Sequence, residues 1–278
     1  MAEQQSPEIG KSVATCGYKT NYHDQGAGYP TLLLHGSGAG VTGWANWRGQ
    51  LPVFAAKYRT LAPDLIGFGF TERLPGFKYA FMDSWVEQQL AFLDALGVDK
   101  VNVVGNSFGG SVALALAVRA PQRLNRIVLM GSGGVKKAAV TPELDQLWGY
   151  TPSPENMKKI MQIMAYDQTL VTDELAELRY RASIRPGVQE TFEALFPPPR
   201  QRWLDIQAQT DEALRAIAHP VMIIHGREDR VVKPEGSFRM MELIPNAQLH
   251  VFGKCGHWTM IEHKDRFNRL VMDFFGEG

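Results

Sequence analysis

The sequence predicts an α/β fold in which helices are doubly wound around a mostly parallel β-sheet. Short β-rich runs each lead into a Gly-rich or Pro-containing turn; they cover residues 31–34, 58–62, 101–104, 126–130, 221–225 and 248–252. These runs are almost continuously apolar, which is typical of strands buried on both faces. Helical patterns separate several of them, so strands and helices alternate along the chain.

The helices between these strands have start and stop signals in the sequence. Ser84 is expected to cap a helix over residues 85–96, with Glu87 completing a capping box and Gly97 ending the helix. The next helix is predicted over residues 108–119, because Pro121 stops it. A terminal helix over residues 264–275 is expected to cover the sheet.

A helical insertion interrupts the alternation between residues 135 and 218. Its predicted helices cover residues 153–165, 172–184, 187–196 and 202–208, and a run of three prolines breaks the pattern at 197–199. We therefore predict a core made of residues 1–134 and 219–278, with residues 135–218 as a helical cap or lid. A cap over the carboxyl ends of the strands closes a pocket from water.

Composition excludes several classes of protein. The 278 residues include 29 Lys+Arg and 29 Asp+Glu, so the net charge of zero disfavours a nucleic-acid partner. Two cysteines, Cys16 and Cys255, cannot make a disulfide framework. Neither a signal peptide in residues 1–20 nor an apolar run long enough for a membrane span is present, so we expect a cytoplasmic protein without a membrane partner.

The segment Gly105-Asn106-Ser107-Phe108-Gly109 fits the G-x-S-x-G pattern in a strand–turn–helix setting. The two glycines let the backbone fold tightly beneath Ser107, because neither has a Cβ. Ser107 would then stand at a helix N-terminus, where the Phe108 N–H can meet developing negative charge. The segment therefore predicts a serine nucleophile.

A serine hydroxyl needs a base that takes its proton. His257 and Asp229 each follow a predicted strand, and the carboxyl ends of parallel strands share one edge of the sheet. The chain order is nucleophile, acid, histidine, in which Asp229 would hold the imidazole tautomer. Glu228 is the alternative acid, although we expect it at the surface.

The turn His35-Gly36-Ser37-Gly38 follows the first apolar strand and is expected to present the Ser37 N–H as a second oxyanion donor beside that of Phe108. His35 is expected to pack and hydrogen-bond locally, and Cys255 to be a packed thiol. A metal site joining His35, His225 and His250 lacks a recognised ligand spacing, so no metal is predicted.

From about Tyr18 to its C-terminus the chain resembles the meta-cleavage product hydrolases, which hydrolyse carbon–carbon bonds in bacterial aromatic degradation. The motifs that carry the resemblance are His35-Gly36-Ser37-Gly38, Trp44-Ala45-Asn46-Trp47, Gly105-Asn106-Ser107-Phe108-Gly109-Gly110, Arg181-Ala182-Ser183-Ile184-Arg185-Pro186-Gly187, His225-Gly226-Arg227-Glu228-Asp229 and Gly256-His257-Trp258. The combination of Asn46, Asn106 and Arg185 is particular to this family. One departure is Ala39, where these enzymes usually have Pro, which bears on the rigidity of the turn.

The resemblance implies an α/β-hydrolase fold, the triad Ser107, Asp229 and His257, and an oxyanion hole of the Ser37 and Phe108 amides. Further implied are Asn46, Asn106 and Arg185 as partners of a substrate's carboxylate and 2-oxo group, and Trp258 as a pocket wall. The implied substrate is a small anionic dienoate, a 2-hydroxy-6-oxohexa-2,4-dienoate cleaved at C5–C6 without a cofactor. The family analogy also implies a homodimer or higher homo-oligomer.

Two other functions remain open from the sequence. A small-ester carboxylesterase would use the same triad without needing Arg185 or Asn46. A catalytically silent binding protein on the same fold is disfavoured by the complete set of Ser107, Asp229 and His257. Dehalogenase and epoxide hydrolase chemistry requires an Asp at the elbow, so Ser107 excludes both. The substituent at C6 of the substrate, be it hydrogen, methyl or ethyl, is not fixed by the sequence.

Overall fold

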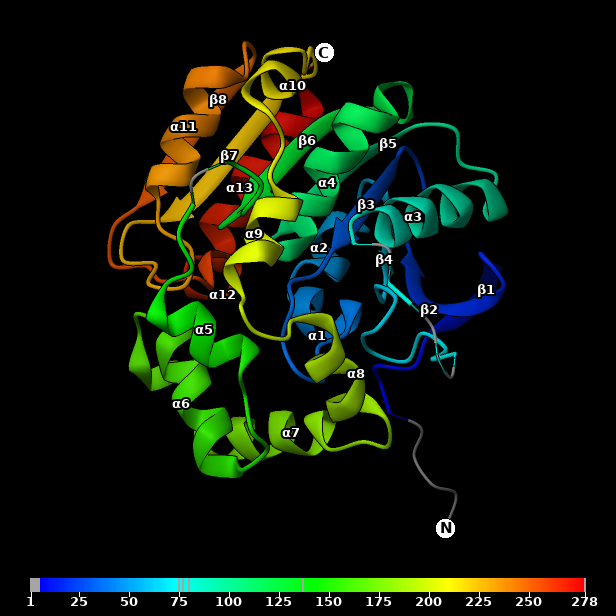
Figure 1. The fold of residues 1–278 in the computed structure, drawn as a ribbon. Coiled ribbons are helices and arrows are strands. Elements are labelled where there is room, and N and C mark those ends of the chain that lie inside the picture. Colours follow the sequence, from blue (N-terminus) through cyan, green and yellow to red (C-terminus); the bar gives the residue numbers. More distant parts are fainter. Residues whose placement is uncertain (1–5, 75, 77, 80, 137, 278) are drawn as a thin grey trace.

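The computed structural model describes residues 6–74, 76, 78–79, 81–136 and 138–277, and one sheet organises this part of the chain (Figure 1). Its strands are β1 (Lys11–Thr15), β2 (Tyr18–Gln25), β3 (Pro30–Leu34), β4 (Arg59–Pro63), β5 (Val101–Asn106), β6 (Leu124–Met130), β7 (Val221–Gly226) and β8 (Ala247–Phe252). Among the described residues the sheet has eight strands in the order β1-β2-β4-β3-β5-β6-β7-β8.

The sheet is parallel from β4 through to β8, and β1 and β2 add an antiparallel edge. The prediction of a mostly parallel sheet is therefore confirmed. The sequence did not indicate β1 and β2 because their side chains are polar and partly exposed. By contrast, β5 and β7 are buried along their whole length, which is why their apolar runs stand out.

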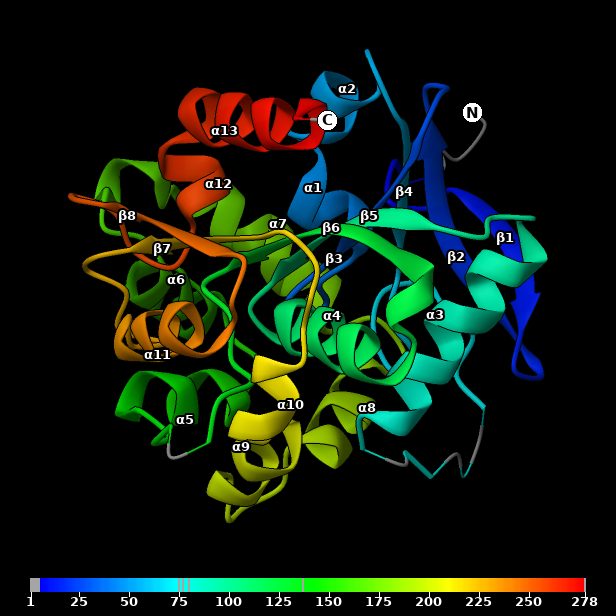
Figure 2. The same ribbon diagram turned by 90° about the horizontal axis from the view of Figure 1, so that it is seen from above.

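Helices cover both faces of the sheet (Figure 2). On one face lie α3 (Asp83–Ala95), α4 (Phe108–Arg119) and α11 (Glu235–Leu243). The other face is covered by α1 (Gly43–Trp47), α2 (Leu51–Phe54), α12 (Thr259–Glu262) and α13 (Lys264–Gly276). Each layer buries its own apolar cluster against the sheet, including Trp85 and Phe92 on the first face and Trp47 and Phe267 on the second.

One helix begins differently from the prediction. Helix α3 starts at Asp83, and Met82 with φ 66° occupies the N-cap position. Ser84 thus lies inside the first turn, so the expected capping box is wrong. The expected stop is correct, because Leu96 forms the C-cap and Gly97 follows with φ +63°.

A helical block, called the cap below, is inserted between β6 and β7; its first four helices lie beyond the carboxyl ends of the strands, whereas its last helix lies at the opposite end of the sheet beside α11 (Figure 1). It comprises α5 (Pro142–Trp148), α6 (Pro154–Met164), α7 (Asp173–Ser183), α8 (Val188–Leu195), α9 (Gln201–Gln207) and α10 (Asp211–Arg215). Helices α6 and α7 begin where the sequence predicts, because the Ser153 and Thr172 hydroxyls accept from the amides of Asn156 and Leu175.

Short 3₁₀ turns complete the fold at Pro121–Arg123 and Gln168–Leu170. The helices α5 and α10 were not predicted, because each is a short segment with little apolar periodicity. Within the described residues, no helix combines the length and apolar character that crossing a membrane requires.

Candidate active site

Ser107 stands at a strained turn between β5 and α4. Its φ of 54° and ψ of −115° are unusual for a residue with a Cβ. A Cβ at Gly105 would lie 2.5 Å from the Gly109 carbonyl oxygen, and a Cβ at Gly109 would lie 2.4 Å from that of Leu34. Both glycines are therefore required by close backbone approach, and the turn holds the Ser107 side chain at the carboxyl edge of the sheet.

Asp229 and His257 are brought together from the loops that follow β7 and β8. His257 Nδ1 lies 2.6 Å from Asp229 Oδ2, and the Val231 and Val232 amides donate to Asp229 Oδ1 at 2.8 and 3.0 Å. The His257 backbone is fixed in turn, because its N–H donates to the Met164 carbonyl oxygen of the cap at 2.7 Å. The carboxylate thus orients the imidazole through Nδ1 and leaves Nε2 for another partner.

The environment of Asp229 favours its charged form. Burial by itself raises the pKa of this carboxyl. The charge of a protonated His257, together with hydrogen bonds from His225 and His257, outweighs burial and places the pKa below its usual range. Glu228, the alternative acid, instead accepts from the Cys255 amide at 3.0 Å and from the Arg227 guanidinium, away from the imidazole.

The turn after β3 is held by its own histidine. His35 is fully buried; its Nδ1–H donates to the Gly36 carbonyl oxygen at 2.8 Å and its Nε2 accepts from the Leu65 amide at 2.9 Å. Burial lowers the pKa of His35 to about 4, so the ring is neutral at physiological pH. His35 is therefore a packing and hydrogen-bonding residue, as expected.

Ser37 joins this turn to the cap, because Trp148 Nε1 donates to the Ser37 hydroxyl at 2.9 Å. Neither the Ser37 amide nor the Phe108 amide has an acceptor within the described part of the chain. Two such N–H groups beside a nucleophile are what an oxyanion hole requires.

A cavity of about 330 Å³ separates the core loops from the cap. Ser37, Asn46, Asn106, Ser107, His257 and Trp258 line it together. Most of the remaining wall is apolar and comes largely from the cap: Leu144, Leu147, Met157, Ile160, Met161, Met164, Leu170 and Leu175. The predicted site residues that follow different strands thus meet around one largely apolar chamber.

The polar end of this cavity has unused hydrogen-bonding capacity. The side-chain amide nitrogens of Asn46 and Asn106 are both buried and lack a partner among the described residues. Asn46 Oδ1 accepts from the Gly36 amide at 3.4 Å, so the Asn46 NH₂ group points away from Gly36. Donors of this kind are available to bind a polar group of a ligand.

Arg185 does not line this cavity. Its guanidinium stacks on the Phe70 ring with 3.8 Å between Cζ and the ring centroid, while Nε–H donates to the Ala182 carbonyl oxygen at 3.0 Å. The cationic side chains on the cavity wall are instead Arg48 and Arg179. Sequence reasoning missed both, because nothing in their immediate neighbourhood distinguishes them from surface arginines.

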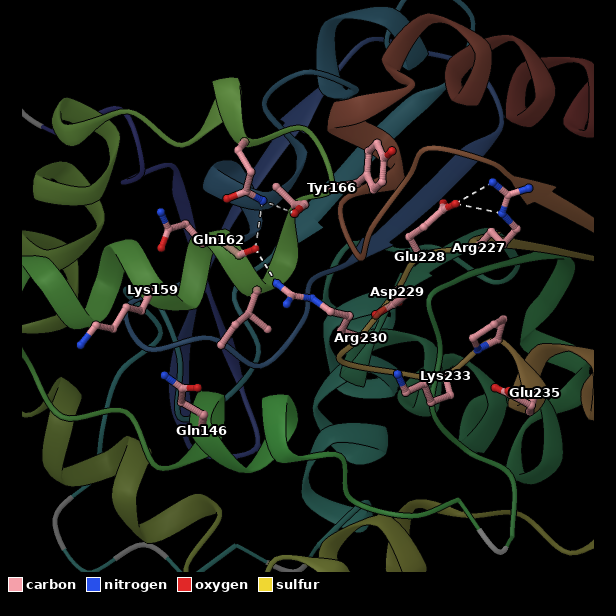
Figure 3. A pocket seen from close by; sticks show the side chains of 14 residues that line it. Gln146, Lys159, Gln162, Tyr166, Arg227, Glu228, Asp229, Arg230, Lys233 and Glu235 are labelled. Atoms are coloured by element: carbon pink, nitrogen blue, oxygen red, sulfur yellow. Dashed lines mark hydrogen bonds and ion pairs between the residues drawn. The ribbon is translucent and has the colours of Figure 1, made fainter.

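A second and larger cavity, of about 940 Å³, is an open groove between α6 and the loop that follows β7 (Figure 3). Arg230 crosses it and donates to the Gln162 carbonyl oxygen at 2.9 Å. Asp229 belongs to its wall, but the Asp229 side chain is 0% exposed and therefore does not face the groove. The groove lies behind the acid and away from Ser107.

Comparison with known proteins agrees with this geometry. The alpha/beta hydrolase fold family model matches residues 29–264. The chain is 52% identical over 276 residues to a 2-hydroxymuconate semialdehyde hydrolase of Pseudomonas sp. (strain CF600), covering 99% of this chain and 97% of that protein. It is 54% identical over 267 residues to a 2-hydroxy-6-oxo-2,4-heptadienoate hydrolase of Pseudomonas putida, covering 96% of each.

A solved structure is equally similar. The meta-cleavage product hydrolase from Pseudomonas fluorescens IP01 has a TM-score of 0.95 and 54% identity, covering 97% of this chain and 98% of that one. The chain belongs to the meta-cleavage product hydrolases. The predicted α/β-hydrolase fold and family are confirmed.

In this meta-cleavage product hydrolase the arrangement can support nucleophilic catalysis. A serine hydroxyl and an imidazole held by a carboxylate face the same chamber, and free amides stand beside the serine. Unpaired amide donors at the polar end provide a place for an oxygen-rich substrate group.

Proposed function

We propose that this enzyme hydrolyses the C5–C6 bond of 2-hydroxy-6-oxohexa-2,4-dienoates, such as 2-hydroxymuconic semialdehyde and its small 6-alkyl analogues. The observation that carries the proposal is one cavity shared by Ser107, His257, Asn46 and Asn106. The relatives at 52% and 54% identity act, by their names, on 2-hydroxymuconate semialdehyde and 2-hydroxy-6-oxo-2,4-heptadienoate.

The reaction begins with a change in the substrate, because a carbon leaving group cannot depart as an unstabilised carbanion. Ketonisation of the 2-hydroxydienoate supplies a conjugated 2-oxo acid that accepts the electron pair of the broken C5–C6 bond. Asn46 and Asn106 donate to the substrate's polar end, since their NH₂ groups are buried and unpaired among the described residues. Arg185 reaches the carboxylate only after leaving its stack on Phe70.

Ser107 then attacks the C6 carbonyl carbon while His257 Nε2 takes its proton. Asp229 keeps the Nδ1–H tautomer of His257 and stabilises the imidazolium. The amides of Ser37 and Phe108 stabilise the oxyanion, each worth about 10²–10³ in rate. His257 returns its proton as the C5–C6 bond breaks and releases 2-hydroxypenta-2,4-dienoate.

Water completes the cycle by hydrolysing the acyl-enzyme, with His257 again as the base. The product is formate when C6 carries hydrogen and a short carboxylate when it carries an alkyl group. The apolar wall of Leu, Ile and Met side chains surrounds the C6 end, and Trp258 lies beside the imidazole. A chamber of about 330 Å³ suits small C6 substituents.

The decisive experiment is to supply purified enzyme with the ring-fission products of catechol, 3-methylcatechol and larger catechols, following loss of the yellow dienolate colour. Ser107→Ala is expected to lower kcat by about 10⁴ or more, with substrate still bound. Near-normal turnover by Ser107→Ala would refute the nucleophile assignment. Hydrolysis of esters with no dienoate turnover would favour a carboxylesterase.

We also propose the division into core residues 1–134 and 219–278 and a cap of residues 135–218, supported by the placement of α5–α10 between β6 and β7. A cytoplasmic location is supported by two free thiols, one exposed at Cys16 and one buried at Cys255. A homodimer or higher oligomer follows from family analogy alone, and sedimentation of the purified enzyme tests it.

A further inference from the structure

Asp229 Oδ2 is shared by two buried imidazoles. His257 Nδ1 lies 2.6 Å from this oxygen, and His225 Nε2 lies 3.2 Å from it. The side chains of His225 and Asp229 are both 0% exposed. The Val231 and Val232 amides donate to Asp229 Oδ1, and His225 and His257 both contact Oδ2.

The tautomer of His225 follows from its neighbours. Its Nε2 faces Asp229 Oδ2 and also the Val232 carbonyl oxygen at 2.9 Å. Both are acceptors, so Nε2 carries the proton. Its Nδ1 lies 2.6 Å from the Ser237 hydroxyl on α11, which donates when the ring is neutral. A chain of contacts thus runs from Ser237 through His225 and Asp229 to His257.

We propose that His225 is a positioning residue of the triad, which together with Ser237 fixes the orientation of the Asp229 carboxylate toward His257. The inference rests on the proposed roles of Ser107, Asp229 and His257. His225 lines neither of the two cavities described above, so it does not touch substrate. It acts on Asp229 directly at Oδ2 and through Val232, whose amide holds Oδ1.

Two consequences follow from a second donor on the same oxygen. A fixed carboxylate keeps the His257 ring oriented to take the proton from Ser107. Loss of the His225 donor therefore lowers turnover. The second donor also competes for the oxygen that holds His257, so losing it changes the hydrogen bond between His257 and Asp229 and moves the pH profile of kcat/KM. A merely structural residue would lower stability without moving the pH profile.

Other ionisable groups around the pair are held by their own contacts. Burial raises the pKa of the Cys255 thiol to about 12, which keeps it neutral. Glu228 is paired with Arg227, and Arg230 donates to the Gln162 carbonyl oxygen. Glu262 on α12 accepts from the amides of Tyr166, Asp167 and Gly256. Within the described part of the chain, none of these groups hydrogen-bonds with His225.

The test compares His225→Leu, which removes the donor, with His225→Gln, whose side-chain amide can keep a donor near the Nε2 position, and with Ser237→Ala. The readouts are kcat/KM against pH on 2-hydroxy-6-oxohepta-2,4-dienoate and the NMR resonance of the hydrogen-bonded Nδ1 proton of His257. Substrate ionisation is common to all variants and cancels in the comparison.

We expect His225→Leu to lower kcat/KM about tenfold, to move the pH profile of kcat/KM, and to shift the Nδ1 proton resonance of His257. His225→Gln is expected to stay within about threefold of the wild type, with Ser237→Ala between the two. An unchanged profile and resonance in His225→Leu overturn the inference. If His225→Leu does not fold, an unchanged profile and resonance in folded Ser237→Ala overturn it.

Failure of the proposed function would look different. Turnover retained by Ser107→Ala would refute the assignment of Ser107, Asp229 and His257 as a catalytic triad. Suppose instead that Ser107→Ala loses turnover while His225→Leu keeps the wild-type pH profile and Nδ1 resonance. The triad assignment would then hold, and only the proposed role of His225 would be refuted.

Discussion

Arg179 in cap helix α7 donates from Nη1 to Glu8 Oε1 in the N-terminal segment across 2.9 Å. The same guanidinium donates from Nη2 to the Gly40 carbonyl oxygen at 2.5 Å. The other oxygen of Glu8 accepts from the hydroxyl of Thr42, the N-cap residue of α1. One side chain therefore ties the cap to the loop that carries Ser37.

The first prediction concerns this tie. Arg179→Met should raise KM for the dienoate about tenfold, since the cap and the Ser37 loop lose their shared anchor and Glu8 is left buried without its cation. The thermal midpoint should also fall. Steady-state kinetics and thermal unfolding measure both. Arg181→Met is the matched control, because Arg181 is exposed and pairs with Glu177 one turn away; equal effects of the two variants would contradict the prediction.

The second prediction separates the substrate classes at Arg185. Burial lowers the pKa of this guanidinium without neutralising it, so Arg185 remains a cation on the cap. Arg185→Met should reduce kcat/KM on the dienoate by about 10² and leave p-nitrophenyl acetate turnover nearly intact, because the ester has no carboxylate. Parallel assays of both substrates measure the ratio. A proportionate fall on both would show that Arg185 supports the cap rather than the substrate.

The third prediction identifies the acid of the triad. Asp229→Asn should lower kcat by about 10⁴, because an amide at this position favours the wrong imidazole tautomer. Glu228→Gln should change kcat by less than about threefold, since Glu228 faces the Cys255 amide and the Arg227 guanidinium. Single-turnover kinetics on the dienoate compare the two. The reverse ranking would move the acid role to Glu228.

The fourth prediction follows from the buried imidazole of His35. Its pKa of about 4 in the folded protein lies below the ordinary value of 6.5, so the unfolded chain binds the extra proton first. The contribution of His35 to stability is complete above pH 6.5 and is lost progressively down to pH 4. The loss is about 1.4 kcal/mol per pH unit at most.

Urea unfolding at several pH values between 7 and 4 measures this loss. In His35→Gln the free energy of unfolding should fall less steeply with acid than in the wild type, although it starts lower. Parallel curves for the two proteins would show that His35 is not the titrating group.

Local sequence determined the frame of this enzyme. The apolar strand patterns, the close approach of Gly105 to the Gly109 carbonyl oxygen, and the Ser153 and Thr172 caps arise from residues close together in the sequence. Gly109, by contrast, is required by the Leu34 carbonyl oxygen of a neighbouring strand. The carboxyl ends of parallel strands share one edge of the sheet, so Ser107, Asp229 and His257 were expected there; the strand order itself was not predicted. Their catalytic roles remain the proposal that the variants above test.

Tertiary structure alone decided the direction of the long and buried polar side chains. Arg179 pairs with Glu8, which is 171 residues away in the sequence. Arg185 stacks on Phe70 and is not part of the cavity wall. The antiparallel edge β1 and β2 and the second imidazole on Asp229 were likewise invisible in the sequence. Backbone turns are set by nearby residues, but a guanidinium or imidazole settles wherever distant chain segments supply its acceptors.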